Sequence, residues 1–156
     1  MIANRATAEL FHAEGAAHVV VADLNEAGAK EVAAAIDGTG VGLDVSDEGA
    51  VAAMIRDVES AHGRVDVVFS NAGYATRGGL EAGNEHLQKM YEVHVMAHVY
   101  ACRAALPGML ERGEGYLLST ASAAGLLSQI GSIAYSVTKH AAVALAEWLA
   151  ITHGPQ

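Results

Sequence analysis

Tyr135 and Lys139 lie four residues apart, within the run Tyr-Ser-Val-Thr-Lys near the end of the sequence. On a helix, this spacing places the phenol and the ammonium on one face. A nearby cation favours the charged phenolate, so the pair would donate or accept a proton near neutral pH. The spacing alone is weak evidence, because a solvated helix face supplies such a pair by chance.

Ser122 precedes Tyr135 by 13 residues, in a segment of small residues that follows an apolar run. A hydroxyl at this place would hydrogen-bond the same substrate oxygen that Tyr135 protonates or deprotonates. The alternative is an ordinary loop serine. The elements around these residues decide whether the three side chains can meet.

Strand-like and helix-like segments alternate along the whole chain. The apolar patterns predict helices over 5–14, 25–36, 46–61, 80–111 and 135–152, and strands over 18–22, 41–43, 65–70 and 116–120. We expect the fourth helix to be kinked or interrupted near Pro107. Strands separated by helices need crossover connections, so the sequence predicts an α/β fold with a doubly wound parallel sheet, in a single domain over 1–156.

In such sheets, ligands bind beyond the carboxyl ends of the strands. The residues predicted at those ends are Asp23, Asp44, Asn71 to Gly73, and Thr120 to Ser122. Gly38, Gly40 and Gly42 precede a strand instead of following one, which argues against a phosphate-binding turn there.

Composition limits the classes of function. The 156 residues are 52% hydrophobic, enough for one domain with a full core. Nine basic against 18 acidic residues give a net charge of −9, which disfavours nucleic-acid and membrane-surface binding. No apolar run reaches the length of about 18 residues needed to span a bilayer. The single cysteine, Cys102, fits a reducing, cytoplasmic location and is interpreted as a buried apolar side chain.

Taken in order, these motifs resemble the classical short-chain dehydrogenase/reductase family. The matching residues are Asp23, Asp44-Val45, Ser70-Asn71-Ala72-Gly73 in place of the usual Asn-Asn-Ala-Gly, Ser122, and Tyr135-Ser136-Val137-Thr138-Lys139. The resemblance covers nearly the whole chain. It implies an incomplete Rossmann-like fold and an NAD(P)-dependent oxidoreductase that transfers hydride between a nicotinamide cofactor and a secondary alcohol or ketone.

The resemblance also implies roles for the candidate catalytic residues. Tyr135 would be the general acid/base, and Ser122 would orient the substrate. Lys139 would support Tyr135 and hold the nicotinamide ribose.

The cofactor residues are also implied by the resemblance. Asp23 would bind the adenosine ribose, and because Leu24 follows it with no cation to offset its charge, NAD is expected over NADP. Asp44 and Val45 would contact adenine. The segment Asn71, Ala72 and Gly73 would lie along the ribose. The simpler alternatives are a strand-end or helix-cap role for Asp23 and a turn-forming role for the others.

The sequence departs from the family at both ends. Arg5 to Phe11 matches the helix after the family's glycine-rich turn, which places Ile2 and Asn4 where the last two glycines belong. The chain stops at Gln156, directly after the predicted active-site helix. We therefore expect an internal fragment of a longer protein, with weak cofactor binding and little activity by itself.

His94 aligns with an asparagine that is the family's fourth catalytic residue. Imidazole cannot copy an amide that donates and accepts in one geometry, so a proton relay at this position is questionable.

His94 and His98 have the four-residue spacing of a zinc helix, but the companion glutamate and a third ligand are missing, so no metal is predicted. Ser136 and Lys139 form a Ser-x-x-Lys pattern without the other motifs of penicillin-binding enzymes.

Two functions from different classes remain. The first is the NAD-preferring oxidoreductase, with a small alcohol or ketone as its partner. The second is an inactive fragment or pseudoenzyme that acts as a binding or oligomerisation module. A receiver-like phosphorylation domain is excluded, since Lys139 lies in a predicted helix.

The complete protein is expected to form a homo-dimer or homo-tetramer through its long and last helices, with apolar contacts from Val99, Leu106, Leu145 and Trp148.

Overall fold

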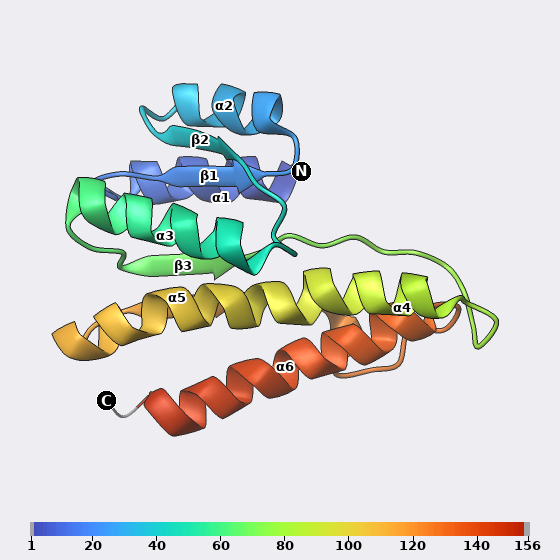
Figure 1. The fold of residues 1–156 in the computed structure, drawn as a ribbon. Coiled ribbons are helices and arrows are strands. Elements are labelled where there is room, and N and C mark those ends of the chain that lie inside the picture. The colour runs from blue at the N-terminus through green and yellow to red at the C-terminus, as the bar shows by residue number, and fades with distance from the viewer. Residues whose placement is uncertain (1, 155–156) are drawn as a thin grey trace. The chain divides into compact units, whose positions relative to one another are not determined.

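The computed structural model describes the backbone of residues 2–154 and the side chains of residues 5–154. The chain forms two compact units, Met1–Val45 and Ser46–Gln156. Each unit contains one pair of parallel strands with helices packed against it (Figure 1). The predicted α/β class with parallel strands is confirmed.

The first unit consists of α1 (Ile2–Ala13), β1 (Val20–Asp23), α2 (Glu26–Ala34) and β2 (Thr39–Gly42). The two strands are parallel, with Val20 opposite Thr39 and Asp23 opposite Gly42. The core is formed by small and branched apolar side chains from α1, β1, α2 and the turn after α2. They are Ala8, Val21, Ala29, Val32, Ala33 and Ile36.

Glycines in and before β2 allow α2 and β1 to approach closely. A Cβ atom at Gly40 would lie 2.5 Å from the Lys30 Cα, and one at Gly42 would lie 2.8 Å from the Glu26 Cβ. At Gly38 it would lie 2.4 Å from the Val19 carbonyl oxygen. These glycines therefore have a packing role.

The second unit contains the remaining elements. They are α3 (Glu48–His62), β3 (Val67–Ser70), α4 (Asn84–Tyr91), the π-helical segment η1 (Glu92–Met96), α5 (Ala97–Arg112), β4 (Tyr116–Ser119), the 3-10 turn η2 (Ala123–Gly125) and α6 (Ile133–His153). β3 and β4 pair in parallel, with Ser70 opposite Ser119. Helix α5 packs against α3 and β3, while α6 packs against α4, η1 and η2 (Figure 1).

The helix boundaries follow local capping chemistry. The Asn25 side chain accepts a hydrogen bond from the Gly28 N–H at the start of α2. Asp47 does the same for the Ala50 N–H at the start of α3. Gly63, at φ +82°, ends α3 in a left-handed conformation that suits glycine.

The long helical region differs from the prediction. Helix α5 contains Pro107 and continues to Arg112, so the proline does not interrupt it. The irregularity lies earlier, at the π-helical segment Glu92–Met96. A π turn inserts one extra residue into a helix, and apolar periodicity does not reveal such an insertion. None of the described helices is long and apolar enough to cross a membrane.

Candidate active site

The catalytic candidates Tyr135 and Lys139 lie on α6, one turn apart. The Ser132 side chain caps the helix by accepting a hydrogen bond from the Tyr135 N–H at 3.4 Å. The Lys139 Nζ lies 5.7 Å from the centre of the Tyr135 ring. Lys139 is only 3% exposed, and this burial lowers the pKa of its ammonium from the ordinary value. The structure therefore brings a cation close to the phenol.

The buried ammonium also joins α6 to the ends of β3 and β4. The Lys139 Nζ donates a hydrogen bond to the Thr120 carbonyl oxygen at 2.9 Å. The Thr120 hydroxyl donates to the Asn71 Oδ1 at 2.5 Å, and the Thr120 N–H donates to the Ser70 carbonyl oxygen at 2.9 Å. Both strand ends are thus fixed beside Lys139, where a parallel sheet binds ligands.

Ser122 begins the 3-10 turn that follows β4. Its Oγ accepts a hydrogen bond from the Ala124 N–H at 3.1 Å. The turn rests directly on α6, because a Cβ atom at Gly125 would lie 2.7 Å from the Lys139 carbonyl oxygen and 2.6 Å from the Val143 Cγ2. Among the described residues, no hydrogen bond joins the side chains of Ser122 and Tyr135. The structure places the Ser122 turn against α6, the helix that carries Tyr135 and Lys139.

His94 lies at the π-helical segment and is completely buried. Its Nε2 lies 3.1 Å from the Tyr74 backbone nitrogen, and its Nδ1 lies 2.9 Å from the Thr138 Oγ1. Burial, followed by the charges of Lys139 and His98, lowers the pKa of His94 to about 4. Each nitrogen of the imidazole thus takes part in one hydrogen bond, Nε2 with the Tyr74 backbone and Nδ1 with Thr138.

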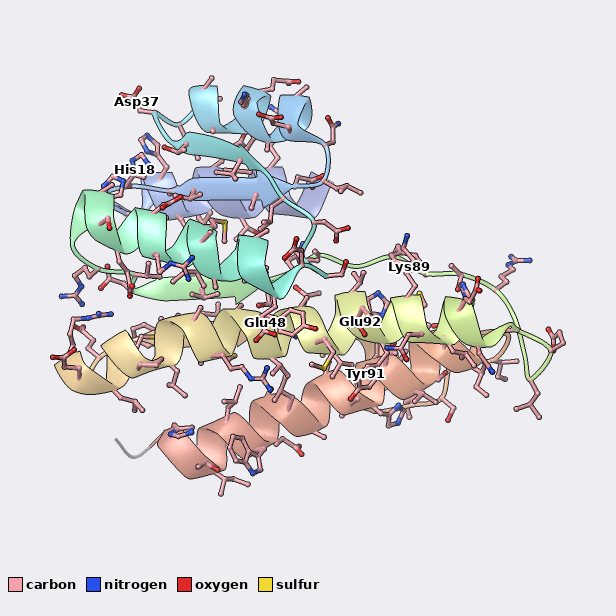
Figure 2. The ribbon with its side chains drawn as sticks, viewed as in Figure 1. His18, Asp37, Glu48, Lys89, Tyr91 and Glu92 are labelled. Carbon is pink, nitrogen blue, oxygen red and sulfur yellow. The ribbon has the colours of Figure 1, made fainter. Side chains whose placement is uncertain are left out.

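Glu92, labelled in Figure 2, is the first residue of the π-helical segment, and its carboxylate bonds to side chains before and after that segment. The Gln88 Nε2 donates to the Glu92 Oε1 at 2.5 Å, and the Tyr100 hydroxyl donates to the Glu92 Oε2 at 3.2 Å. Arg103 of α5 forms an ion pair at 3.0 Å with Glu48 of α3. Glu48 is labelled in Figure 2. The two bonds of Glu92 lie within the long helical region itself, and the ion pair joins that region to α3.

The segment after β3 lies against the same group of side chains. A Cβ atom at Gly73 would lie 3.1 Å from the His94 Nε2 and 3.7 Å from the Lys139 Nζ. A larger residue at this position would therefore press on the imidazole, and the backbone after β3 passes close to both the ring and the ammonium. Asn71, Ala72 and Gly73 are all partly buried.

The cofactor candidates of the first unit lie at its strand ends. Asp23 is the last residue of β1, and its Oδ1 accepts a hydrogen bond from the Asn25 N–H at 2.9 Å. Asn25, not Asp23, caps α2. Leu24 is 76% exposed. Asp44 and Val45 follow β2 and Leu43.

Cys102 and His98, two further residues considered from the sequence, are both buried. Cys102 is buried, and burial raises the pKa of its thiol to about 11, as suits an apolar packing role. His98 is 1% exposed, and neither of its ring nitrogens has a hydrogen-bond partner among the described residues. Nor do the described side chains include a group of three or more His, Cys, Asp or Glu that could hold a metal ion.

The two buried imidazoles predict a loss of stability in acid. Burial, followed by the charge of Lys139, also lowers the pKa of His98 to about 4, from an ordinary value of 6.5. Between these values the unfolded chain binds more protons than the folded chain, so stability falls as the pH falls through this window. Each imidazole contributes about 1.4 kcal/mol per pH unit to the slope of the unfolding free energy against pH.

Urea unfolding of this chain at about pH 6.5 and about pH 4.5 measures that slope. His98→Leu is expected to reduce it, whereas His12→Gln, a change at an exposed histidine of α1, is expected to leave it unchanged. Equal slopes in the unsubstituted chain and in His98→Leu would contradict the assignment.

Sequence reasoning named Thr120 at a strand end and Thr138 within the Tyr-Ser-Val-Thr-Lys run, but it assigned no partner to either hydroxyl. It missed the backbone of Tyr74. The structure bonds the Thr120 hydroxyl to Asn71, and it bonds both the Thr138 hydroxyl and the Tyr74 N–H to the His94 ring. The place of Thr138 three residues after Tyr135, on the same helix face, was an available signal.

Comparison with known proteins agrees with this geometry. The family model described as short chain dehydrogenase matches residues 4–156. The 2-keto-3-deoxy-L-fuconate dehydrogenase of Xanthomonas campestris is 35% identical over 147 residues, which are 92% of this chain and 48% of that protein. The meso-2,3-butanediol dehydrogenase of Serratia marcescens is 35% identical over 155 residues, covering 97% of this chain and 61% of that protein.

A solved structure is also similar to this chain. The crystal structure of a short-chain dehydrogenase from Streptomyces avermitilis aligns with a TM-score of 0.91 and 35% identity, over 97% of this chain and 56% of that one. The chain thus spans about half to three-fifths of these relatives. Their Rossmann-type fold is the one that the strand pairs and helices described above partly reproduce. The chain belongs to the short-chain dehydrogenase family.

Proposed function

We propose that this chain is the central part of an NAD(P)-dependent oxidoreductase that interconverts a secondary alcohol and a ketone. The observation that supports it most is the buried Lys139 ammonium, 5.7 Å from the Tyr135 ring and bonded to the end of β4. The phenolate form of Tyr135 would take the proton from an alcohol, and the phenol form would return it to a ketone oxygen. Ser122 would hold that same oxygen.

The polar groups at the strand ends suit a nicotinamide cofactor in their chemistry. Asp23 offers a carboxylate to ribose hydroxyls at the end of a parallel strand, and Asp44 with Val45 follows the next strand. Asn71 to Gly73 and the Lys139 ammonium offer backbone and charge at the end of β3. When bound, the cofactor supplies or accepts the hydride. The protein would bind and orient it and would move the proton at the Tyr135 oxygen.

Asp23 is the basis for a preference for NAD. Its charge would repel the 2′-phosphate of NADP, and the neighbouring Leu24 brings no cation. We expect NADH to bind at least about tenfold more tightly than NADPH, and Asp23→Asn to remove most of this difference. The measurement is fluorescence titration with both cofactors.

The titration uses the extended chain, defined as this chain joined at both ends to the segments of meso-2,3-butanediol dehydrogenase outside the matched part. Glu26→Gln is the control, since Glu26 is an exposed carboxylate three residues from Asp23 whose partner is Lys30. Tighter binding of NADPH by the unsubstituted extended chain would refute the NAD preference.

The second candidate is a non-catalytic binding or oligomerisation module. The relative named inactive 2-(S)-hydroxypropyl-CoM dehydrogenase 2, from Xanthobacter autotrophicus, is 36% identical over 90% of this chain. Steady-state assays of the extended chain with NAD and a series of secondary alcohols separate the two functions. The oxidoreductase proposal requires alcohol-dependent formation of reduced cofactor, and the module predicts none.

Self-association of the complete protein forms part of the proposal. Trp148 on α6 is 57% exposed, and Val137 and Ile151 of the same helix are also exposed. Exposed apolar side chains of this size on one helix favour contact with another protein surface. A second copy of the same helix is the partner that we propose.

A further inference from the structure

We propose that His94 is a positioning residue. Its neutral imidazole, protonated on Nδ1, holds the backbone after β3 against α6 beside Tyr135 and Lys139, and it takes no part in proton transfer. The placement follows from the hydrogen bonds of this chain, while its importance for turnover rests on the proposed function.

The hydrogen bonds determine the tautomer. The Tyr74 backbone nitrogen can only donate, so the His94 Nε2, 3.1 Å away, must accept with its lone pair. A neutral imidazole then carries its proton on Nδ1, which donates to the Thr138 Oγ1 at 2.9 Å. The Thr138 hydroxyl donates in turn to the Ala134 carbonyl oxygen at 2.7 Å. Each donor has an acceptor, so the bonds run in one direction from the loop into α6.

The surroundings of the ring oppose a second proton. A protonated Nε2 would point its N–H at the N–H of Tyr74, replacing a hydrogen bond with a repulsive contact. The ionisable groups around the ring are Lys139 and Tyr135 on α6, Tyr74 on the loop and His98 on α5. None of them is a carboxylate that would stabilise an imidazolium. His94 is therefore neutral near pH 7, and its lone pair is already bonded to the backbone.

The imidazole lies where it can fix the catalytic side chains. Its ring centre is 5.6 Å from that of Tyr135 at an interplanar angle of 88°, an edge-to-face contact. The Tyr74 ring packs on it at the same centroid distance, with a 60° angle. Gly73 passes so close that an added Cβ would meet the imidazole before the Lys139 ammonium. The loop after β3, the Tyr135 ring and Lys139 thus share His94 as a common neighbour.

Nuclear magnetic resonance of this chain, labelled with nitrogen-15 histidine, tests the tautomer without any catalytic assay. Long-range proton–nitrogen spectra distinguish Nδ1–H from Nε2–H, and His94→Gln assigns the signal by its loss. We expect the Nδ1–H form with no titration between about pH 8 and about pH 5.5. An Nε2–H form, or titration near the ordinary histidine pKa, would overturn the inference.

A matched pair of variants in the extended chain tests the positioning role. Thr138→Val removes the acceptor of the Nδ1–H at nearly constant volume, and Thr138→Ser keeps it. We expect Thr138→Val to lower kcat by about ten- to hundredfold while the cofactor Kd changes less than about twofold. Thr138→Ser should restore kcat to near the unsubstituted value.

Unchanged kcat in a folded Thr138→Val protein would contradict the positioning role, and so would Thr138→Ser as impaired as Thr138→Val. If Thr138→Val fails to fold, His94→Leu takes its place. It removes both ring nitrogens that make hydrogen bonds and the ring that contacts Tyr135, and it should lower kcat in the same way. An extended chain that turns over no alcohol in any form would refute the proposed function, whereas the tautomer would still be decided by the spectra of this chain.

Discussion

Replacing Tyr135 by phenylalanine in the extended chain is expected to lower kcat by about a thousandfold or more, because the change removes the hydroxyl that we propose to transfer the proton. The ring itself stays, so its edge contact with His94 and its place one turn from Lys139 are kept. Cofactor affinity should therefore change less than about twofold. Stopped-flow turnover and fluorescence titration measure the two quantities separately.

Tyr116→Phe is the matched control for this prediction. Tyr116 begins β4 and is 61% exposed, so losing its hydroxyl should leave turnover unchanged. A Tyr135→Phe protein that keeps more than about a tenth of the unsubstituted kcat would show that another group transfers the proton.

Replacing Lys139 by methionine should damage both turnover and cofactor binding. The methionine keeps the apolar stem but loses the ammonium that lies beside the Tyr135 ring and donates to the Thr120 carbonyl oxygen. We expect kcat to fall by about a hundredfold or more and cofactor Kd to rise by about tenfold. The combined loss distinguishes Lys139 from Tyr135, whose replacement should affect turnover alone.

Lys89→Met supplies the control, because Lys89 is exposed on α4 in the same unit (Figure 2). Urea unfolding of both variants separates loss of function from loss of fold, since the unpaired Thr120 carbonyl costs about 1–3 kcal/mol if it stays buried. A folded Lys139→Met protein with unaltered cofactor affinity would contradict the proposed ribose contact.

Local chemistry made much of the fold predictable from the sequence. Several element boundaries depend on neighbouring residues alone. They are the strand ends at Asp23 and Ser70, the cap at Asn25 and the helix end at Gly63. The predicted helix of 80–111 was correct in type, but its π-helical segment was not predictable. A π turn adds one residue to a helix, and the apolar pattern of the sequence does not reveal this insertion.

The catalytic candidates were predictable from motif order, whereas their supporting contacts were not. Tyr135 and Lys139 share a helix face at a fixed spacing, so their proximity follows from helix geometry. The bonds of His94 to Thr138 and to Tyr74 join residues 44 and 20 positions apart. Only the tertiary fold brings such partners together, so an alignment of His94 with an asparagine could not show which hydrogen bonds the imidazole makes.

Deuterium transfer tests the central claim most directly. The extended chain is supplied with NAD and a secondary alcohol that carries deuterium at the hydroxyl-bearing carbon, and the reduced cofactor is analysed by mass spectrometry. The proposed oxidoreductase moves that deuterium to the cofactor once per ketone formed, and Tyr135→Phe suppresses the transfer. Cofactor binding without any transfer from a series of such alcohols would contradict the oxidoreductase and favour the binding module.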